Sequence, residues 1–378
     1  MKDKYLFDWV KKLITNNLEV YLVGGTVRDY LLNIEPKDLD FLVVGSKDLL
    51  EISNIINKFG KVDIVGQSFG VLKLTINGET YDIAIPRKET KVGDGHTDFI
   101  VETENVSLQE DMYRRDFTMN SIVYDIVNDC YLDFYKGMDD IYNKIINVTN
   151  PKAFIEDPLR ILRATQFSSR FGFNIHYDTR ELILNNKHNL KYISIERIII
   201  ELDKIYYKGD INLGFELLNE FNIFNENIHN LLIEDIQTRA DFYFVLNDDS
   251  INDKLDNETK TIINDIKKLY NLNNVLNGID FPSNIRMELF TILYKNTGIM
   301  KSGVLPKIFN KYIKEFETNL YPFSYKQLNI NGDTLMLLGF KGIDIKSMLN
   351  QCLIKIFSND LINDKDVLYN FCKELRDK

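Results

Sequence analysis

Residues from about Glu19 to Asp133 alternate short apolar runs with turns rich in Gly, Asn and Asp, a pattern typical of β-strands. Helical spacing of apolar residues appears between these runs and before them. The Asn77-Gly78 pair between two of the runs indicates a β-hairpin turn. The pattern predicts strands over Glu19–Val23, Asp40–Val44, Lys61–Ile64, Gly70–Ile76, Glu79–Ile85 and Ser121–Asp125, and helices over Met1–Asn17, Thr26–Leu32 and Leu49–Asn57.

After about residue 150 the strand signals fade, and helical periodicity dominates to the end of the chain. This order predicts an α+β fold class. We expect an N-terminal domain with a mixed β-sheet and flanking helices, followed by an all-α remainder. At about 100–200 residues per domain, a chain of 378 residues has room for two to four domains.

The composition is that of an ordinary globular protein, with 44% hydrophobic and 27% charged residues, and it excludes a disordered or fibrous chain. No apolar run reaches the roughly 18 residues of a transmembrane helix. The predicted N-terminal helix has Trp9 and Leu13 on its apolar face and lacks the features of a secretory signal. Cys130, Cys352 and Cys372 have no CxxC spacing, so we expect three buried thiols in a reducing cytoplasm.

Charge and arginine usage direct attention to the first half of the chain. The formal net charge is −10 at pH 7, so any contact with nucleic acid is expected from local patches. Lysine outnumbers arginine 34 to 12, so each arginine is a candidate for a task that needs the planar guanidinium group. Five arginines fall between residues 114 and 170, and we expect the chemistry within the first 170 residues.

A predicted strand, a glycine pair and a predicted helix follow one another at residues 19–32. Gly24 and Gly25 would let backbone amides approach a phosphate closely, and the helix that follows would present free N–H groups. Arg28, one turn into that helix, would reach the same anion. A plain glycine turn with no ligand is the alternative.

Two aspartates, Asp38 and Asp40, flank Leu39 at the start of the next predicted strand. Residues two apart in a strand point to the same side, so their carboxylates would lie together and repel unless a cation neutralises them. Oxygen ligands of this kind suit Mg²⁺. The alternative is that these aspartates only form a turn. Asp82, in the middle of a later strand, would complete the metal-binding set or would face solvent.

Clustered arginines form a second candidate site. Arg114 and Arg115 lie on a predicted turn, where two guanidinium groups would bind a polyphosphate. The alternative is a solvated basic turn in which Asp116 pairs with one arginine.

Asp157, Pro158 and Arg160 are expected at the start of a helix, with Asp157 as the N-cap and Pro158 as the first helical residue. Asp157 and Arg160 are three apart and would be neighbours there. A carboxylate beside a guanidinium would pair with the edge of cytosine or adenine and reject uracil and guanine. The alternative is a capped helix with an ordinary ion pair.

Together these segments resemble the class II CCA-adding enzymes, within the tRNA nucleotidyltransferase and bacterial poly(A) polymerase superfamily. The first 200 residues match in order and spacing, and a later stretch resembles the family's tail. The matching segments are Gly24–Asp29, Asp38–Asp40, Arg114–Asn120, Asp133–Ile141, Glu156–Arg160, Ser194–Arg197 with Glu201-Leu202, and Gly332–Gly342 with Asn363.

The resemblance implies a catalytic head over residues 1–145, a neck over 146–208 that recognises the base, a body over 209–315, and a tail over 316–378 that contacts tRNA. It implies CTP, ATP and the tRNA 3′ end as partners, and Mg²⁺ bound by Asp38 and Asp40. The tRNA 3′-hydroxyl would attack the α-phosphate and release pyrophosphate. Residues implied to bind the nucleotide are Gly24, Gly25, Arg28, Arg115, Asp157, Arg160 and Arg163.

Lys88–Asp111 would be a mobile loop that takes part in the switch from C to A addition. One departure concerns Gln166, where such families often carry an arginine, so triphosphate affinity is expected to be weaker. Asp139-Asp140 also stands where Asp-Leu is usual.

Other functions compatible with these motifs are a bacterial-type poly(A) polymerase and a CC-only or A-only tRNA nucleotidyltransferase. Outside the enzyme class, the chain would be a noncatalytic tRNA-binding scaffold. A metal-dependent HD phosphohydrolase domain is not expected, because none of the four histidines is followed by aspartate.

Overall fold

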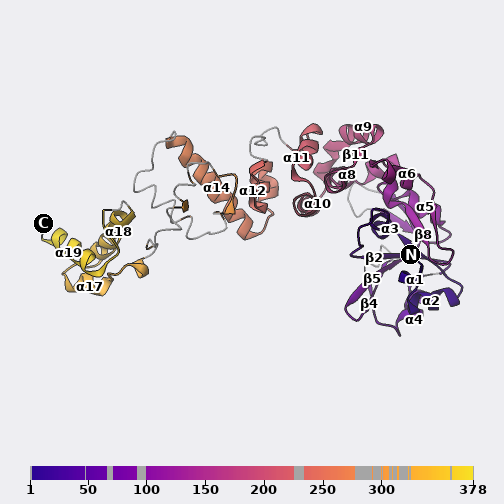
Figure 1. Ribbon diagram of the computed structural model, residues 1–378, viewed down its shortest axis with the longest axis horizontal. Coiled ribbons are helices and arrows are strands. Elements are labelled where there is room, and N and C mark those ends of the chain that lie inside the picture. The colour runs from indigo at the N-terminus through magenta and orange to yellow at the C-terminus, as the bar shows by residue number, and fades with distance from the viewer. Residues whose placement is uncertain are drawn as a thin grey trace. The chain divides into compact units, whose positions relative to one another are not determined.

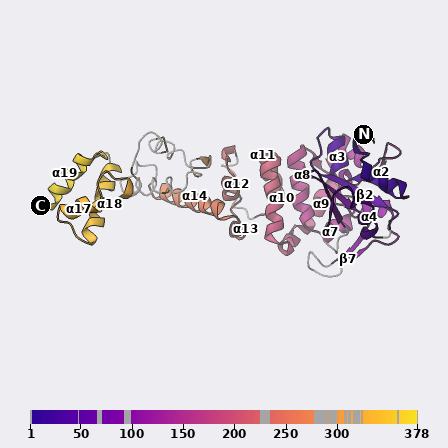
Figure 2. The same ribbon diagram turned by 90° about the horizontal axis from the view of Figure 1, so that it is seen from below.

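The computed structural model describes residues 2–46, 48–65, 71–91, 99–224, 234–276, 292, 299, 301–305, 309, 313–314, 322, 325–357 and 360–377. The chain folds into two compact units, Met1–Ile223 and Phe224–Lys378. The first unit holds a β-sheet with helices around it, and the described part of the second is helical (Figures 1 and 2). The predicted α+β fold class is confirmed.

A mixed seven-stranded sheet forms the centre of the first unit, with strand order β3-β4-β5-β2-β1-β8-β9. Strands β2 and β5 are parallel, and the other neighbouring pairs are antiparallel. All six predicted strands are confirmed, with ends shifted by at most one residue, although Gly70 lies outside the described residues. The strands are β1 Glu19–Val23, β2 Leu39–Val44, β3 Lys61–Val65, β4 Val71–Ile76, β5 Glu79–Ala84, β8 Ile122–Asp125 and β9 Cys130–Asp133.

The sheet is buried on both faces because successive side chains of a strand point to opposite sides. On one face Leu42 packs in a cluster with Val23, Val123 and Met112. On the other face the ring of Phe41 contacts that of Trp9, with centroids 4.7 Å apart. The predicted hairpin turn between β4 and β5 is also confirmed, since Asn77 and Gly78 have φ angles of 52° and 88°, as a type I′ turn requires.

The helices of the N-terminal region differ from the sequence prediction at one point. The expected single helix over Met1–Asn17 is wrong, because the backbone at Phe7 is extended, with a ψ angle of 158°. This break lets the ring of Phe7 approach Tyr81 of β5, with centroids 5.1 Å apart. The helices here are α1 Lys2–Tyr5, α2 Asp8–Thr15, α3 Gly25–Leu31, α4 Leu49–Ile56, α5 Leu108–Tyr113 and α6 Gly137–Tyr142.

The segment expected to be a loop, Lys88–Asp111, contains regular structure. Strand β6, Lys88–Lys91, pairs antiparallel with β7, Phe99–Glu102, and α5 follows. Residues 92–98 lie outside the described part. Sequence periodicity missed this ladder because both strands are only four residues long.

Helices continue through the rest of the first unit. Helix α8 packs against both α10 and α11, and a short parallel pair of strands, β10 and β11, lies beside it. These elements are α7 Pro151–Glu156, α8 Leu159–Phe171, α9 Tyr177–Asn186, α10 Ile195–Lys208, α11 Ile211–Glu220, β10 Ile145–Ile146 and β11 Asn174–Ile175. Short 3₁₀ helices cover Thr118–Asn120 (η1) and Lys187–Tyr192 (η2).

The regular elements described in the second unit are all helices. Cys352 and Cys372 are buried with their Sγ atoms 3.5 Å apart, whereas Cys130 on β9 is exposed, so the prediction of three buried thiols is wrong for Cys130. None of the described helices is long and apolar enough to cross a membrane. The described elements of the second unit are α12 Arg239–Leu246, α13 Asp249–Asn252, α14 Asn257–Leu276, η5 Tyr325–Gln327, α17 Gly332–Leu337, α18 Ile343–Phe357 and α19 Lys365–Arg376.

Candidate active site

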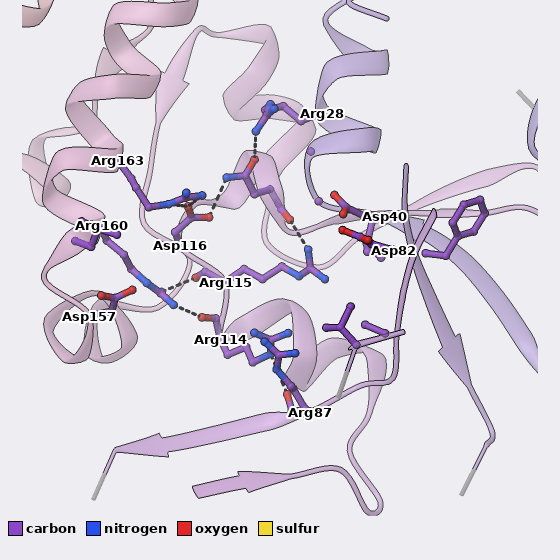
Figure 3. Close-up of a pocket in the computed structure, with 18 of the residues that line it drawn as sticks. Arg28, Asp40, Asp82, Arg87, Arg114, Arg115, Asp116, Asp157, Arg160 and Arg163 are labelled. Carbon is purple, nitrogen blue, oxygen red and sulfur yellow. Dashed lines mark hydrogen bonds and ion pairs between the residues drawn. The ribbon is translucent and has the colours of Figure 1, made fainter. Parts of the chain in front are cut away.

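The glycine turn after β1 lies beside a cavity that is lined by many charged side chains (Figure 3). Gly24 has a φ angle of +64°, and a Cβ atom there would lie 2.8 Å from Nη1 of Arg115 and 3.4 Å from Oδ2 of Asp40. A side chain would therefore fill the gap between a guanidinium group and a carboxylate. The glycine at this position is needed for both its backbone conformation and its small size.

The parallel pairing of β2 and β5 places Asp40 directly opposite Asp82. Burial raises the pKa of Asp40 to about 6, and the Asp82 and Asp38 carboxylates add to the rise while Arg115 opposes it. Oδ1 of Asp82 is buried without a hydrogen-bond partner and lies 3.6 Å from Nζ of Lys73. These two neighbouring carboxylates are oxygen donors whose mutual repulsion a divalent cation would relieve.

Asp38 is exposed and lies immediately before β2, where its carboxylate is near enough to raise the pKa of Asp40. Thr26 of α3 ties this segment down, because its hydroxyl donates to the Asp38 carbonyl and accepts from the Asp40 N–H. Asp40 and Asp82 line the cavity described below, whereas Asp38 does not. Among the described residues, no group of three His, Cys, Asp or Glu side chains is arranged as a ready metal site.

Arg114 and Arg115, at the C-terminal end of α5, are held by carboxylates rather than solvated. Asp111, which is fully buried, accepts from Nη2 of Arg114 at 2.9 Å and from Nη2 of Arg115 at 3.1 Å. Burial alone would raise the pKa of Asp111, but the two arginines keep it below its usual value. Glu89 of β6 pairs with Arg114 at 3.2 Å and with Arg87 at 2.7 Å. The sequence analysis missed Asp111, Glu89 and Arg87 as members of this site.

Asp116 pairs with Arg163 of α8 and is not part of a solvated basic turn. Oδ2 of Asp116 lies 2.6 Å from Nη2 and 2.8 Å from Nε of Arg163. Burial would raise the pKa of Asp116, but Arg163 and Arg160 hold it well below its usual range. Glu201 of α10 lies 3.7 Å from Nη1 of the same guanidinium. Arg163 is therefore fixed by carboxylates from two sides.

The connection between α7 and α8 differs from the expected helix cap. Helix α8 begins at Leu159, its N-cap is Pro158, and no side chain caps it. The backbone of Asp157 is extended and its carboxylate lies 3.5 Å from Nη2 of Arg197, so the predicted N-cap role is wrong. Asp157 and Arg197 both line the cavity.

The Arg160 guanidinium donates to backbone oxygens and not to the Asp157 carboxylate. Its Nη2 bonds the Arg114 carbonyl at 2.7 Å and its Nη1 bonds the Arg115 carbonyl at 3.0 Å. Among the described contacts, Asp157 and Arg160 form no ion pair, so the ordinary i,i+3 bridge considered above is absent. The backbone between α5 and η1 thus fixes the direction of the Arg160 guanidinium.

Arg28 is buried and contacts four neighbours. Its Nε donates to Asp29 at 2.8 Å, its Nη1 donates to Oδ1 of Asn120 at 2.7 Å, and its guanidinium lies 5.1 Å from the rings of Phe167 and Phe171. Arg28 therefore joins α3 to α8 as well as lining the cavity.

Most of these charged groups surround one cavity of about 580 Å³, a volume in the range of small-molecule sites. Arginines outnumber aspartates on its wall, so it favours a polyanionic ligand. Gln166 is buried in α8 and is not one of the lining residues. The charged lining residues are Arg28, Arg87, Arg114, Arg115, Arg160, Arg163 and Arg197 with Asp40, Asp82, Asp116 and Asp157.

Comparison with known proteins gives two family matches and full-length relatives. Residues 20–147 match the poly A polymerase head domain, and residues 172–231 match a probable RNA and SrmB-binding site of polymerase A. A CCA-adding enzyme of Staphylococcus haemolyticus is 30% identical over 399 residues, which cover 97% of this chain and 96% of that protein. One from Staphylococcus saprophyticus is 28% identical over 96% of both chains.

Solved structures share the fold. A crystal structure of the Bacillus stearothermophilus CCA-adding enzyme in complex with CTP has a TM-score of 0.71 and 24% identity, covering 98% of this chain and 96% of that one. The Thermotoga maritima CCA-adding enzyme complexed with tRNA has a TM-score of 0.70 and 23% identity, covering 97% and 94%.

Proposed function

Because the chain belongs to the family of CCA-adding enzymes, which are nucleotidyltransferases, we propose that it adds C, C and A to the 3′ end of tRNA from CTP and ATP. One observation carries the proposal. A single cavity unites arginines and the Asp40–Asp82 pair of the sheet with Asp157 and Arg160 at the start of α8. In such a cavity the arginines would bind a triphosphate, the aspartate pair would lie near its reacting phosphorus atom, and Asp157 with Arg160 would contact the base.

The positively charged part of the cavity would bind the triphosphate. Gly24 leaves space beside Arg115 and Gly25 leaves space beside Arg28, and Arg115 would donate to the phosphate oxygens. Arg28 and Arg163 would contribute charge from fixed positions, because Asp29, Asn120 and Asp116 already hold their guanidinium groups.

Asp157 and Arg160 would select the base in place of a nucleic-acid template. The Asp157 carboxylate would accept from the exocyclic amine of cytosine or adenine, and the remaining donors of Arg160 would reach the adjacent ring nitrogen. Uracil and guanine offer a carbonyl where the carboxylate needs a donor, and they would be rejected. The two carbonyl bonds of Arg160 support this role because they restrict its orientation.

Asp38 and Asp40 would hold Mg²⁺, and Asp82 would be the third catalytic carboxylate. The raised pKa of Asp40, and the Asp82 oxygen that has no hydrogen-bond partner, support a cation at this place. When bound, Mg²⁺ would supply Lewis-acid activation of the tRNA 3′-hydroxyl and neutralise charge on the phosphates.

The reaction would be an in-line attack of the tRNA 3′-hydroxyl on the α-phosphate of the bound nucleotide. Pyrophosphate would leave on the side of Arg115, whose charge stabilises it. We further propose that residues 1–145 act as the catalytic head and 146–208 as the base-selecting neck. Residues 209–315 and 316–378 would be a body and a tail, the latter contacting tRNA, in a cytoplasmic enzyme.

Single-turnover incorporation tests this function. Purified protein with Mg²⁺ would be mixed with tRNA transcripts that end before CCA, after C or after CC, together with each nucleotide alone and with CTP plus ATP. We expect three additions and no more from CTP plus ATP, and none from the Asp38→Ala/Asp40→Ala variant. Products ending at CC, addition of A alone, or a long A-tail would assign one of the related activities instead. Binding of tRNA without incorporation would indicate a scaffold.

A further inference from the structure

Asn120, the last residue of η1, contacts both sides of the cavity although no motif assigns it a role. Its side chain is buried, with an exposure of 6%, and it lines the cavity. We propose that Asn120 is a positioning residue that sets Arg28 and Asp116 relative to each other and thereby determines nucleotide affinity. This inference rests on the proposed function of the cavity as a nucleotide site.

The amide of Asn120 makes one hydrogen bond as an acceptor and one as a donor. Its Oδ1 accepts from Nη1 of Arg28 at 2.7 Å, and its Nδ2 donates to Oδ1 of Asp116 at 2.9 Å. A guanidinium group can only donate and an ionised carboxylate can only accept. Only a side chain with both an acceptor and a donor can bridge Arg28 and Asp116. A carboxylate in place of the amide would repel the Asp116 carboxylate.

These bonds complete a continuous chain of contacts across the cavity. Arg28 comes from α3, Asp116 precedes η1, and Arg163 belongs to α8, as Figure 3 shows for the labelled side chains. The chain runs from Arg28 through Asn120 to Asp116 and on to Arg163. It therefore links the phosphate side of the proposed nucleotide site to the helix that carries Arg160.

Hydrogen bonds and neighbouring packing hold Asn120 in place, so its amide can fix the positions of the groups that it contacts. Its N–H donates to the Phe117 carbonyl at 2.9 Å, and the Phe117 ring packs against Phe154 and Phe167. The Asn120 carbonyl in turn accepts from Nη1 of Arg115 at 3.5 Å. One buried residue thus touches three charged groups of the cavity.

The test measures steady-state incorporation of CTP and ATP by Asn120→Ala, which removes both bonds without adding charge. We expect KM for each nucleotide to rise about tenfold while kcat changes less than about threefold, because binding groups are displaced and the Asp40–Asp82 pair is not. Asn128→Ala is the matched control, since that exposed amide also donates to an aspartate, Asp125, but outside the cavity. The control should keep the wild-type KM.

Two additional variants separate positioning from a purely structural role. Asn120→Asp has the same shape and keeps the contact to Arg28, but it places a second carboxylate against Asp116. It should therefore also raise KM. This variant provides the test if Asn120→Ala does not fold. In an Arg28→Lys background, Asn120→Ala should raise KM less than about threefold, because the guanidinium that it positions is gone.

A KM within about twofold of wild type for the folded Asn120 variants would overturn the inference. So would an increase in KM from Asn120→Ala that is as large in the Arg28→Lys background as in the wild type. Failure of the proposed function is distinguishable because it appears in the wild type. If the wild type binds CTP in calorimetry but does not incorporate it, dissociation constants of the same variants replace KM. A wild type that binds neither nucleotide contradicts both proposals.

Discussion

The Asp40 carboxyl combines a half-buried position with two neighbouring carboxylates, so its charge is unfavourable in the metal-free protein. The pKa of Asp40 is raised to about 6, above the value near 4 of an ordinary aspartate. The folded protein therefore binds more protons than the unfolded chain between these two pH values. Stability from this group is greatest at low pH and is lost as the pH rises through about 6.

Asp40→Asn should make the metal-free protein more stable at pH 7.5, by on the order of 1–2 kcal/mol. The difference from wild type should shrink as the pH falls toward 4, because the wild-type carboxyl is then protonated. Urea denaturation in EDTA at both pH values measures it. A variant that is less stable than wild type at pH 7.5 would show that Arg115 outweighs the two carboxylates.

Individual site residues were predictable where the signal is local, and unpredictable where it depends on pairing between distant segments. Gly24 follows a strand, and Asp40 lies at the start of another. Nearby residues alone were therefore enough to propose their roles. The contact between Asp40 and Asp82 required knowing that β2 and β5 are neighbours. Arg160 binds backbone carbonyls 45 and 46 residues away, and backbone acceptors leave no sequence signal.

At the scale of elements, the strands were predictable because each is an apolar run ended by turn residues. The break between α1 and α2 was not, since helical spacing continues across Phe7 and only its ring contacts favour the extended backbone. Strand β9 was missed because it lies at the sheet edge, where its four residues need no apolar pattern.

The turn between β1 and α3 gives a prediction about this pair of elements. Gly24→Ala should lose at least tenfold in kcat/KM, because its Cβ would lie 2.8 Å from Nη1 of Arg115 and displace it, in addition to backbone strain. Gly78→Ala is the matched control, since Gly78 also has a positive φ angle but has no atom within 4 Å of the added Cβ.

The control should lose stability, by about 1 kcal/mol, and keep its kcat/KM. Thermal unfolding and incorporation kinetics of both variants measure the two effects separately. If both variants lost stability equally and neither lost activity, the gap beside Gly24 would not be part of the nucleotide site.

For the molecule as a whole, the cavity is assembled by contacts between the sheet and α8. Asp116 and Arg163 are 47 residues apart in the sequence, and Arg28 meets Asn120 across 92 residues. Sequence motifs identified most of these residues but not which of them pair. The structure adds that protein groups hold Arg28, Arg115, Arg160 and Arg163, so the guanidinium groups on the cavity wall have fixed positions.

The central claim is that side chains of this chain, in place of a template, choose the nucleotide. The most direct measurement is the ratio of kcat/KM for CTP over UTP on tRNA lacking CCA, and for ATP over GTP on tRNA ending in CC. The wild type should strongly prefer CTP and ATP. Asp157→Ala should reduce both ratios at least tenfold, because the acceptor that rejects a carbonyl is gone.

Asp139→Ala, on the exposed side of α6, should leave the ratios unchanged and serves as the control. If Asp157→Ala incorporated more slowly but kept the wild-type ratios, the base would be chosen elsewhere, and the account given for this cavity would be contradicted.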